Sequence, residues 1–197
     1  MTCWAVIPVK ASLESKSRLA NALDTDARRL LVRSMLEHVV DAATQAANIS
    51  KVCLLGPSRH GLSEDLPLLS EPGGGLNAAV QSALEHIAGQ DVDRVVFIAA
   101  DLPTVTASEL ELLAAAPEGE IAIAPDRHET GTNALSLPLP AAASFCFAFG
   151  PDSFALHRAE AQRLGLPMET ILSHGLARDI DEPTDLPDAA ELLKRSG

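Results

Sequence analysis

Short, nearly continuous apolar runs alternate with segments of helical periodicity along most of this chain. The apolar runs cover residues 3–9, 51–56, 94–100, 121–124 and 133–137, and each has the length of a single strand. Runs that are apolar on both faces are typical of strands buried inside a parallel sheet. The pattern therefore predicts a sheet that is covered on both of its faces.

Helical segments separate these runs. Asp24 or Thr25 can cap a long helix, whose apolar face repeats every three or four residues. This face comprises Ala27, Leu31, Met35, Val39, Ala42 and Ala46. A second helix is expected over residues 76–89, and Thr106 and Glu109 form a capping box that opens a third helix.

The pattern is weaker toward the C-terminus. Residues 145–149 and 178–181 each favour a short strand. Pro151, at a first helical turn, favours a helix through Arg163, and a last helix is expected to end near Arg195. No internal repeat or linker divides the chain.

This order of elements predicts a single α/β domain over residues 1–197, with a mainly parallel mixed sheet and helices on both faces. Right-handed crossovers bring the carboxyl ends of parallel strands to one edge of the sheet, where ligands bind in such folds. The polar residues that follow the strands are therefore the first candidates for a functional site.

Composition and charge exclude several classes of protein. The 197 residues include 15 Lys and Arg against 27 Asp and Glu, which gives a formal net charge of −12. Nucleic-acid binders need a basic face, so no nucleic acid is expected as a partner. No apolar run approaches the roughly 20 residues that span a membrane, and the first run lacks the preceding basic residue of a secretory signal. We expect a cytoplasmic protein with no membrane partner.

The cysteines and histidines do not predict a metal centre. Cys3 and Cys53 lie in apolar runs, so we expect them to be buried free thiols. Cys146 lies far from both in the sequence. Because the chain has no Cys-x-x-Cys pair and no Cys/His cluster, structural zinc is not expected.

The first candidate site is a basic loop that follows the first apolar run. Lys10, Lys16 and Arg18 stand against Glu14 alone, so this part of a strongly acidic chain is positively charged. A cationic loop at the end of a strand can hold a triphosphate and stabilise the charge on a leaving pyrophosphate. The loop is not a Walker A motif, because it has no Gly-Lys-Ser/Thr sequence. The alternative is a loop of solvated lysines.

A glycine-rich segment is the second candidate. Gly73, Gly74 and Gly75 precede Asn77 at the start of the second helix. Residues without a Cβ let the backbone approach a base or a ribose, and the Asn77 amide can both donate and accept hydrogen bonds. A dinucleotide-binding fingerprint is excluded, because it should directly follow the first strand. The alternative is a glycine linker that ends in an Asn cap.

Acidic residues follow two of the predicted strands. Asp101 comes directly after the apolar run 94–100, where a carboxylate can hold Mg²⁺ bound to substrate phosphates. The alternative is an aspartate whose side chain accepts a hydrogen bond from the backbone of its own turn. Asp179 and Asp181 lie in a similar setting, and Asp181 either supplies a second carboxylate or caps the next helix.

Two polar loops complete the candidate site. Thr132 and Asn133, beside Thr130 and Gly131, can surround the carboxylate or phosphate of a small acid. Gly150 and Ser153 lie at a predicted helix start, where backbone N–H groups favour anions. The alternative for the second loop is a capped helix with no ligand.

Eight segments, taken in this order, resemble one family of enzymes. They are residues 7–10, 16–19, 73–77, 100–103, 125–127, 131–135, 149–154 and 179–181. Together they resemble the 2-phospho-L-lactate and phosphoenolpyruvate guanylyltransferases of coenzyme F-420 biosynthesis. More distantly, they are similar to molybdenum-cofactor guanylyltransferases and sugar-nucleotide pyrophosphorylases.

The resemblance implies a three-layer, GT-A-like nucleotidyltransferase fold and a defined reaction. A phosphate oxygen of a three-carbon phospho-acid attacks the α-phosphorus of GTP, and pyrophosphate leaves. The resemblance also implies Mg²⁺ as the cofactor and GTP and a small phospho-acid as the binding partners. The acid (phosphoenolpyruvate, 2-phospho-L-lactate or 3-phospho-D-glycerate) and the choice between a monomer and a homodimer stay open. The alternatives are a molybdenum-cofactor type of nucleotidyltransferase and a non-catalytic nucleotide-binding domain.

The resemblance assigns roles to individual residues. The expected catalytic residues are Lys10, Lys16, Arg18 and Asp101. The expected nucleotide-binding residues are Pro8, Lys10, Gly73, Gly74, Gly75, Asn77 and Asp101. The expected phospho-acid-binding residues are Asp126, Arg127, Thr132, Asn133, Gly150 and Ser153. The expected metal ligands are Asp101 and Asp181.

Overall fold

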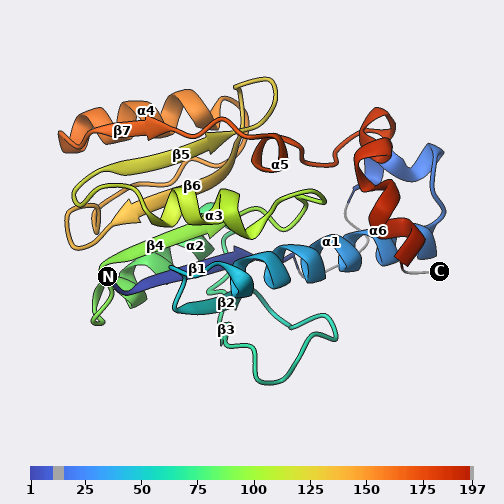
Figure 1. Ribbon diagram of the computed structural model, residues 1–197, viewed down its shortest axis with the longest axis horizontal. Helices are drawn as coiled ribbons and strands as arrows, with labels where there is room; N and C mark the ends of the chain where they lie inside the picture. Colours follow the sequence, from blue (N-terminus) through green and yellow to red (C-terminus); the bar gives the residue numbers. More distant parts are fainter. Residues whose placement is uncertain (11–15, 196–197) are drawn as a thin grey trace.

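The computed structural model describes residues 1–10 and 16–195 (Figure 1). Residues 11–15, the middle of the predicted basic loop and the position of Glu14, lie outside the described residues. The three basic residues of that loop are described.

Within the described residues, the strands form one sheet of seven in the order β3-β2-β1-β4-β6-β5-β7. The strands are β1 (Cys3–Pro8), β2 (Lys51–Leu55), β3 (Leu68–Leu69), β4 (Arg94–Ile98), β5 (Ile121–Pro125), β6 (Thr132–Pro138) and β7 (Met168–Thr170). β6 is antiparallel to both of its neighbours, whereas the other pairings are parallel. The first residues of β6 therefore lie at the edge where β1 and β4 end.

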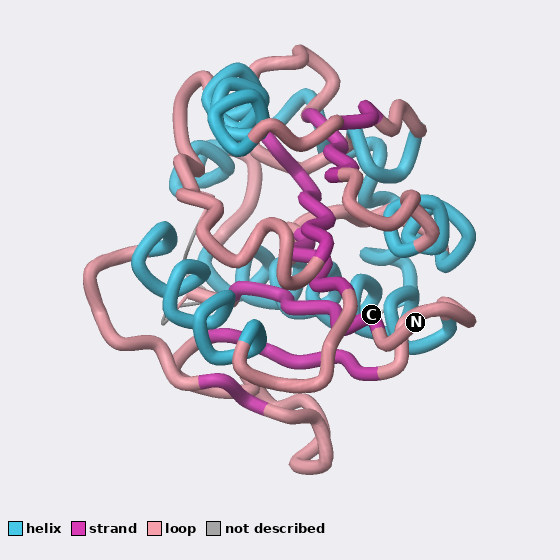
Figure 2. Tube along the Cα trace, turned by 90° about the vertical axis from the view of Figure 1, so that its left-hand side faces the viewer, coloured by secondary structure: helices cyan, strands magenta, loops and turns pink. Residues whose placement is uncertain are grey.

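Helices cover both faces of this sheet, which runs through the middle of the molecule in Figure 2. The α-helices are α1 (Thr25–Gln45), α2 (Leu76–Ala88), α3 (Ala107–Ala114), α4 (Ser153–Leu164), α5 (His174–Ala177) and α6 (Ala190–Arg195). Two 3₁₀ helices are η1 (Ser17–Asn21) and η2 (Pro183–Ala189). Among the described helices, none has both the length and the apolar character needed to cross a lipid bilayer.

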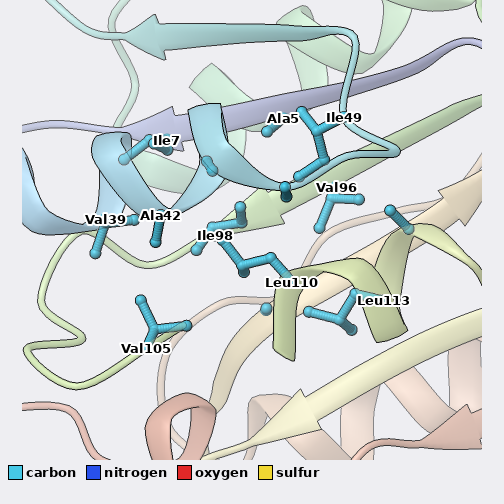
Figure 3. Close-up of a cluster of buried hydrophobic side chains, with 14 of the residues drawn as sticks. Ala5, Ile7, Val39, Ala42, Ile49, Val96, Ile98, Val105, Leu110 and Leu113 are labelled. Carbon is cyan, nitrogen blue, oxygen red and sulfur yellow. The ribbon is translucent and has the colours of Figure 1, made fainter. Parts of the chain in front are cut away.

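Alternate side chains of each central strand enter different layers of the core. One layer, drawn in Figure 3, joins β1 and β4 to α1 and α3. It includes Ala5, Ile7, Val96, Ile98, Val39, Ala42, Leu110 and Leu113. The opposite layer places Val6 and Phe97 against Leu84 of α2. This burial on both faces is what the continuous apolar runs predict.

A third buried cluster fixes the segment around the candidate acidic residues. Leu19 of η1 packs with Leu31 and Met35 of α1 and with Ile180. In Figure 1, α6 lies beside the N-terminal half of α1, away from the sheet. The cluster brings η1, which directly follows Lys16, close to the chain segment that carries Asp181.

Most of the predicted elements are confirmed, including the capping box of Thr106 and Glu109 and the cap at Asp24. Cys3 and Cys53 are free and buried, as predicted. The sequence did not predict the two-residue β3 or the three-residue β7.

The strand predicted at residues 145–149 is wrong, because side chains bind its backbone. Cys146 N–H donates to Glu160, and Ala148 N–H donates to His157. Phe149 N–H donates to the side chain of Asn77. These amides are therefore not available to a neighbouring strand.

The strand predicted at residues 178–181 is wrong for a similar reason. Ile180 N–H donates to the Asp101 carbonyl at 3.3 Å, and Asp181 N–H donates to the Asp185 carboxylate at 2.8 Å. The segment thus lies directly beside the end of β4 without pairing as a strand.

Candidate active site

A cavity of about 470 Å³ opens at the edge of the sheet where β1, β2 and β4 end and β6 begins. Several residues predicted from the sequence line it, drawn from five separate chain segments. These are Pro8, Lys10, Lys16, Gly75, Asp101, Thr132 and Asn133. Most of the remaining wall is apolar, with Leu55, Leu76 and Phe149 among the contributing residues. The sheet edge chosen by the strand pattern is therefore the edge that carries the cavity.

A lysine joins two carboxylates at one side of the cavity. The Nζ of Lys16 donates to Oδ2 of Asp101 and lies 2.7 Å from Oδ1 of Asp181. The Lys16 side chain is only 11% exposed. Burial alone would lower the pKa of Lys16, but attraction to both carboxylates outweighs it and raises this pKa. Lys16 is therefore a permanent cation at this position.

A third carboxylate, that of Asp179, lies close enough to Asp101 and Asp181 to feel their charge. Burial, together with repulsion from Asp101, raises the pKa of Asp179 above its ordinary value. The Asn133 amide donates to Asp179 at 3.3 Å and to the Leu176 carbonyl at 2.9 Å. Asn133, which lines the cavity, therefore holds the acidic segment through its side-chain N–H groups.

The chemistry of these groups fits a divalent cation. Carboxylate oxygens of Asp101 and Asp181 already converge on one small cation, the ammonium of Lys16. No group of three or more His, Cys, Asp or Glu side chains in the described chain is arranged to hold a metal by itself. Mg²⁺ typically takes one or two carboxylates, and phosphate and water oxygens supply the rest. The pair is therefore suited to a metal that arrives with phosphates.

The other two basic residues of the predicted loop lie closer to solvent. Lys10 is exposed and lines the cavity, and its carbonyl oxygen lies 2.8 Å from Nε2 of His60. Arg18 is exposed, with Nη1 3.9 Å from Oδ2 of Asp181. The positive charge thus extends from the mostly buried Lys16 to the exposed Lys10 and Arg18.

The glycine-rich segment forms an exposed turn that reaches the cavity at Gly75. Gly73, Gly74 and Gly75 all have φ near +85°, a region that disfavours residues with a Cβ. Gly75 caps α2 and lines the cavity. Gly73 and Gly74 are exposed and lie outside the cavity lining.

Asn77, predicted to bind the nucleotide, has both ends of its amide bonded within the protein. Its Oδ1 accepts from the Phe149 N–H at 2.7 Å, and its Nδ2 donates to the Phe149 carbonyl at 3.0 Å. Asn77 does not line the cavity. It ties the start of α2 to Phe149, which does line the cavity.

Asp126 and Arg127, predicted to bind the phospho-acid, also have partners within the protein. The Asp126 carboxylate accepts from the N–H groups of residues 128, 130 and 131. Burial would raise the pKa of Asp126, but these bonds outweigh it and lower the pKa. Arg127 donates to the buried carboxylate of Asp185.

Asp185 was not predicted from the sequence. Its side chain is fully buried, and it accepts from the N–H groups of Asp181 and Glu182 at 2.8 and 2.7 Å. Arg127 occupies its other oxygen. The pair of Arg127 and Asp185 therefore fixes the backbone of Asp181. Asp185 closes a capping box with Glu182, three residues earlier. The residues Glu-x-x-Asp do not match the usual Ser/Thr-x-x-Glu/Gln signature of this motif, so no clear signal was present in the sequence.

The expected phospho-acid residues Gly150 and Ser153 lie where the chain enters α4. Phe154 N–H donates to the Thr130 carbonyl, which brings this helix start next to Thr132. Gly150 has φ +131°, and a Cβ added there would meet open space.

The cavity has further polar residues that were not predicted from the sequence. Glu71 and His60 both line it. Glu71 closely follows β3. Had β3 been predicted, Glu71 would have been a candidate, because polar residues that follow strands are the candidates for the site. The Glu71 carboxylate has no hydrogen bond or ion pair among the described residues.

Comparisons with known proteins show the family of this chain. The family model described as "Guanylyl transferase CofC like" matches residues 3–193. A phosphoenolpyruvate guanylyltransferase of Sphaerobacter thermophilus is 42% identical over 96% of this chain and 93% of its own length. A 2-phospho-L-lactate guanylyltransferase of Halorubrum lacusprofundi is 37% identical over 90% of this chain and 78% of its own length.

Solved structures agree on the fold. A nucleotidyl transferase from Methanothermobacter superposes with a TM-score of 0.67 over 100% of this chain and 99% of that one, at 13% identity. At this identity the likeness concerns the fold alone. The expected three-layer nucleotidyltransferase fold is confirmed.

Proposed function

Because this chain belongs to the CofC-like guanylyltransferase family, we propose that it transfers GMP from GTP to the phosphate of a three-carbon phospho-acid. A phosphate oxygen of the acid forms a bond to the α-phosphorus of GTP. The bond from that phosphorus to the bridging oxygen of the β-phosphate breaks, and pyrophosphate leaves. The product joins the acid and guanosine through a diphosphate.

The convergence of Lys16, Asp101 and Asp181 at the cavity carries this proposal. Both reactants are anions, and their mutual repulsion is strong in a site of reduced dielectric constant. The mostly buried Lys16, which stays protonated, offsets part of this charge. Lys10 and Arg18 extend the positive charge toward the β- and γ-phosphates, which become the leaving group.

Asp101 and Asp181 would hold Mg²⁺ when a nucleotide is bound. The ion would neutralise phosphate charge and align the two reacting oxygens. Lys16 now lies between these carboxylates, so we expect its ammonium to turn toward the phosphates as the nucleotide enters. Arg127 and Asp185 keep the backbone of Asp181 in place during this exchange.

The wall formed by Gly75, Leu76 and Glu71 is suited to a guanine base. A carboxylate without a partner repels an anionic ligand unless the ligand offers it hydrogen-bond donors. The N1–H and exocyclic amino group of guanine offer two donors side by side, whereas adenine offers no such pair. Glu71 therefore favours guanine at this wall.

Thr132, Gly150 and Ser153 would receive the phospho-acid at the start of α4. We propose phosphoenolpyruvate as the first acid to test, because the relative of 42% identity carries that name. The relative named for 2-phospho-L-lactate supports a second acid of the same size.

The direct test is product analysis with the purified chain. GTP and Mg²⁺ are incubated with phosphoenolpyruvate, 2-phospho-L-lactate and 3-phospho-D-glycerate, separately and in competition, and products are identified by mass spectrometry. We expect one guanylylated acid and one equivalent of pyrophosphate for each turnover. Binding of GTP without product from any of these acids would instead support a non-catalytic nucleotide-binding domain.

A further inference from the structure

A histidine is buried behind the wall of the cavity. His157 of α4 is fully buried and lies among three phenylalanine rings. The ring of Phe149, which lines the cavity, is 4.9 Å from it between centroids. Burial lowers the pKa of His157 to about 4, although the nearby Glu160 opposes this effect. The imidazole is therefore neutral near pH 7.

The hydrogen bonds of the ring determine which nitrogen carries the proton. The Ala148 N–H lies 3.0 Å from Nε2, and a backbone amide can only donate. Nε2 must then be the acceptor, and in a neutral imidazole the proton is on Nδ1. Nδ1 lies 3.0 Å from Oγ1 of Thr132. His157 therefore donates to the Thr132 hydroxyl.

This hydrogen bond from His157 determines where the hydroxyl hydrogen of Thr132 can point. Because its oxygen accepts from His157, its own hydrogen is directed elsewhere. No described residue accepts that hydrogen. Thr132 begins β6, is 9% exposed and lines the cavity next to the start of α4. The hydrogen is thus left for a ligand in the cavity.

We propose that His157 is a positioning residue, which keeps the Thr132 hydroxyl oriented as a hydrogen-bond donor to an anionic oxygen of the phospho-acid. This inference rests on the proposed function. A hydroxyl that is free to rotate presents its lone pairs to an anion in part of its orientations, which weakens binding. Through Ala148, the same ring also holds the segment that carries Phe149. The buried side chain of His157 thus orients the Thr132 hydroxyl and also holds the neighbouring part of the cavity wall at Phe149.

Two substitutions of His157 separate this role from simple packing. In H157N the amide nitrogen lies near the position of Nδ1, so donation to Thr132 can persist. In H157Q the side chain reaches the position of Nε2, so the bond to Ala148 can persist and donation to Thr132 is lost. We expect H157Q to raise KM for the phospho-acid by roughly tenfold or more, as for losing a hydrogen bond to a charged group. KM for GTP should stay within about twofold of wild type.

A double-mutant cycle that combines substitutions of His157 and Thr132 tests whether His157 acts through Thr132. We expect T132V to raise KM for the acid as H157Q does, T132S to retain most of the affinity, and H157Q to add little in the T132V background. H157N should lie closer to wild type than H157Q. Equal effects of H157N and H157Q on both substrates would instead show that the ring only packs, and would overturn the proposal.

The tautomer can be measured without any substitution. In ¹⁵N-labelled wild-type protein, NMR of the His157 ring should show a proton on Nδ1 and none on Nε2 near pH 7. A proton on Nε2 would refute the inference even if every variant failed to fold. If wild-type protein forms no guanylylated acid, the proposed function fails. If it forms product and H157Q leaves KM for the acid unchanged, only the role of His157 fails.

Discussion

The charged side chains at the cavity differ from one another in burial and in bonding partners. Lys16 is mostly buried and bonded to two carboxylates, whereas Lys10 and Arg18 are exposed. Glu71 is a carboxylate in the same cavity without a partner among the described residues. The repulsion between this carboxylate and an anionic ligand is offset when the ligand donates hydrogen bonds to the carboxylate.

Changing Glu71 to Gln should therefore reduce the preference for GTP. The amide of Gln offers one acceptor and one donor in place of two acceptors, so it no longer matches the paired donors of guanine. We expect the ratio of kcat/KM for GTP over ATP to fall by roughly tenfold or more. Pyrophosphate release with each nucleotide measures this ratio.

The control is E64Q, which changes an exposed glutamate on the other side of β3. The side chain of Glu64 pairs with Arg59. E64Q should leave the ratio unchanged. An unaltered ratio in E71Q would show that Glu71 does not contact the base.

At the scale of elements, η2 and the turn after β5 together hold Asp181. Burial would raise the pKa of Asp185, but hydrogen bonds from Glu182, Arg127 and Asp181 outweigh it and lower the pKa. A carboxyl with a lowered pKa in the folded state stabilises the fold above its ordinary pKa of about 3.9. This contribution is lost as the pH falls through the lower, folded-state value.

The variant D185N should remove this pH-dependent stabilisation and loosen Asp181. We expect it to lower the free energy of unfolding by about 3 kcal/mol at neutral pH, since it breaks a buried ion pair. The difference from wild type should shrink as the pH drops below about 4. Urea unfolding between neutral pH and pH about 3 measures this.

D188N is the control within the same element, because the pair of Asp188 and Arg178 is partly exposed. It should cost about 1 kcal/mol or less. Equal losses in D185N and D188N would contradict the special role of the buried carboxylate.

These elements also show what the sequence can and cannot predict. α1 and β4 follow from local periodicity, because their burial repeats along the chain. β3 has two residues and gives no periodic signal. Residues 145–149 have the composition of a strand, but distant partners such as Glu160 and Asn77 bind their amides.

In the candidate site, too, features set by local sequence could be predicted, and features set by distant partners could not. Lys16, Asp101 and Thr132 could be predicted, because each lies at a loop or strand end on the ligand-binding edge of the sheet. The partners of Asn77 and Arg127 could not be predicted. Asn77 bonds Phe149, and Arg127 bonds Asp185, at separations of 72 and 58 residues. Such pairings depend on the tertiary fold, which local patterns do not specify.

At the scale of the whole molecule, the fold buries Cys3 of β1 and Cys53 of β2. Burial raises the pKa of Cys3 to about 12, with Arg94 acting in the opposite direction. Burial likewise raises the pKa of Cys53, whereas Cys146 is exposed. Since the thiolate is the reactive form, only Cys146 should react readily in the folded protein.

Thiol titration with a chromogenic disulfide at about pH 8 tests this arrangement. We expect one equivalent to react quickly in native protein and all of the thiols to react after denaturation. C146S should abolish the fast phase. A fast phase that persists in C146S would show that the core around Cys3 or Cys53 opens easily.

The central claim is that the acidic and basic groups at this sheet edge carry out nucleotidyl transfer. The most direct measurement compares pyrophosphate release by wild type, D101N and D93N, with GTP, Mg²⁺ and the preferred acid. Asp93 precedes the same strand at its opposite end and accepts from the Thr2 N–H, so D93N is a matched control. We predict that D101N keeps its fold and loses roughly 10³-fold or more in rate, while D93N retains nearly all activity. Near-wild-type pyrophosphate release by folded D101N would contradict the account.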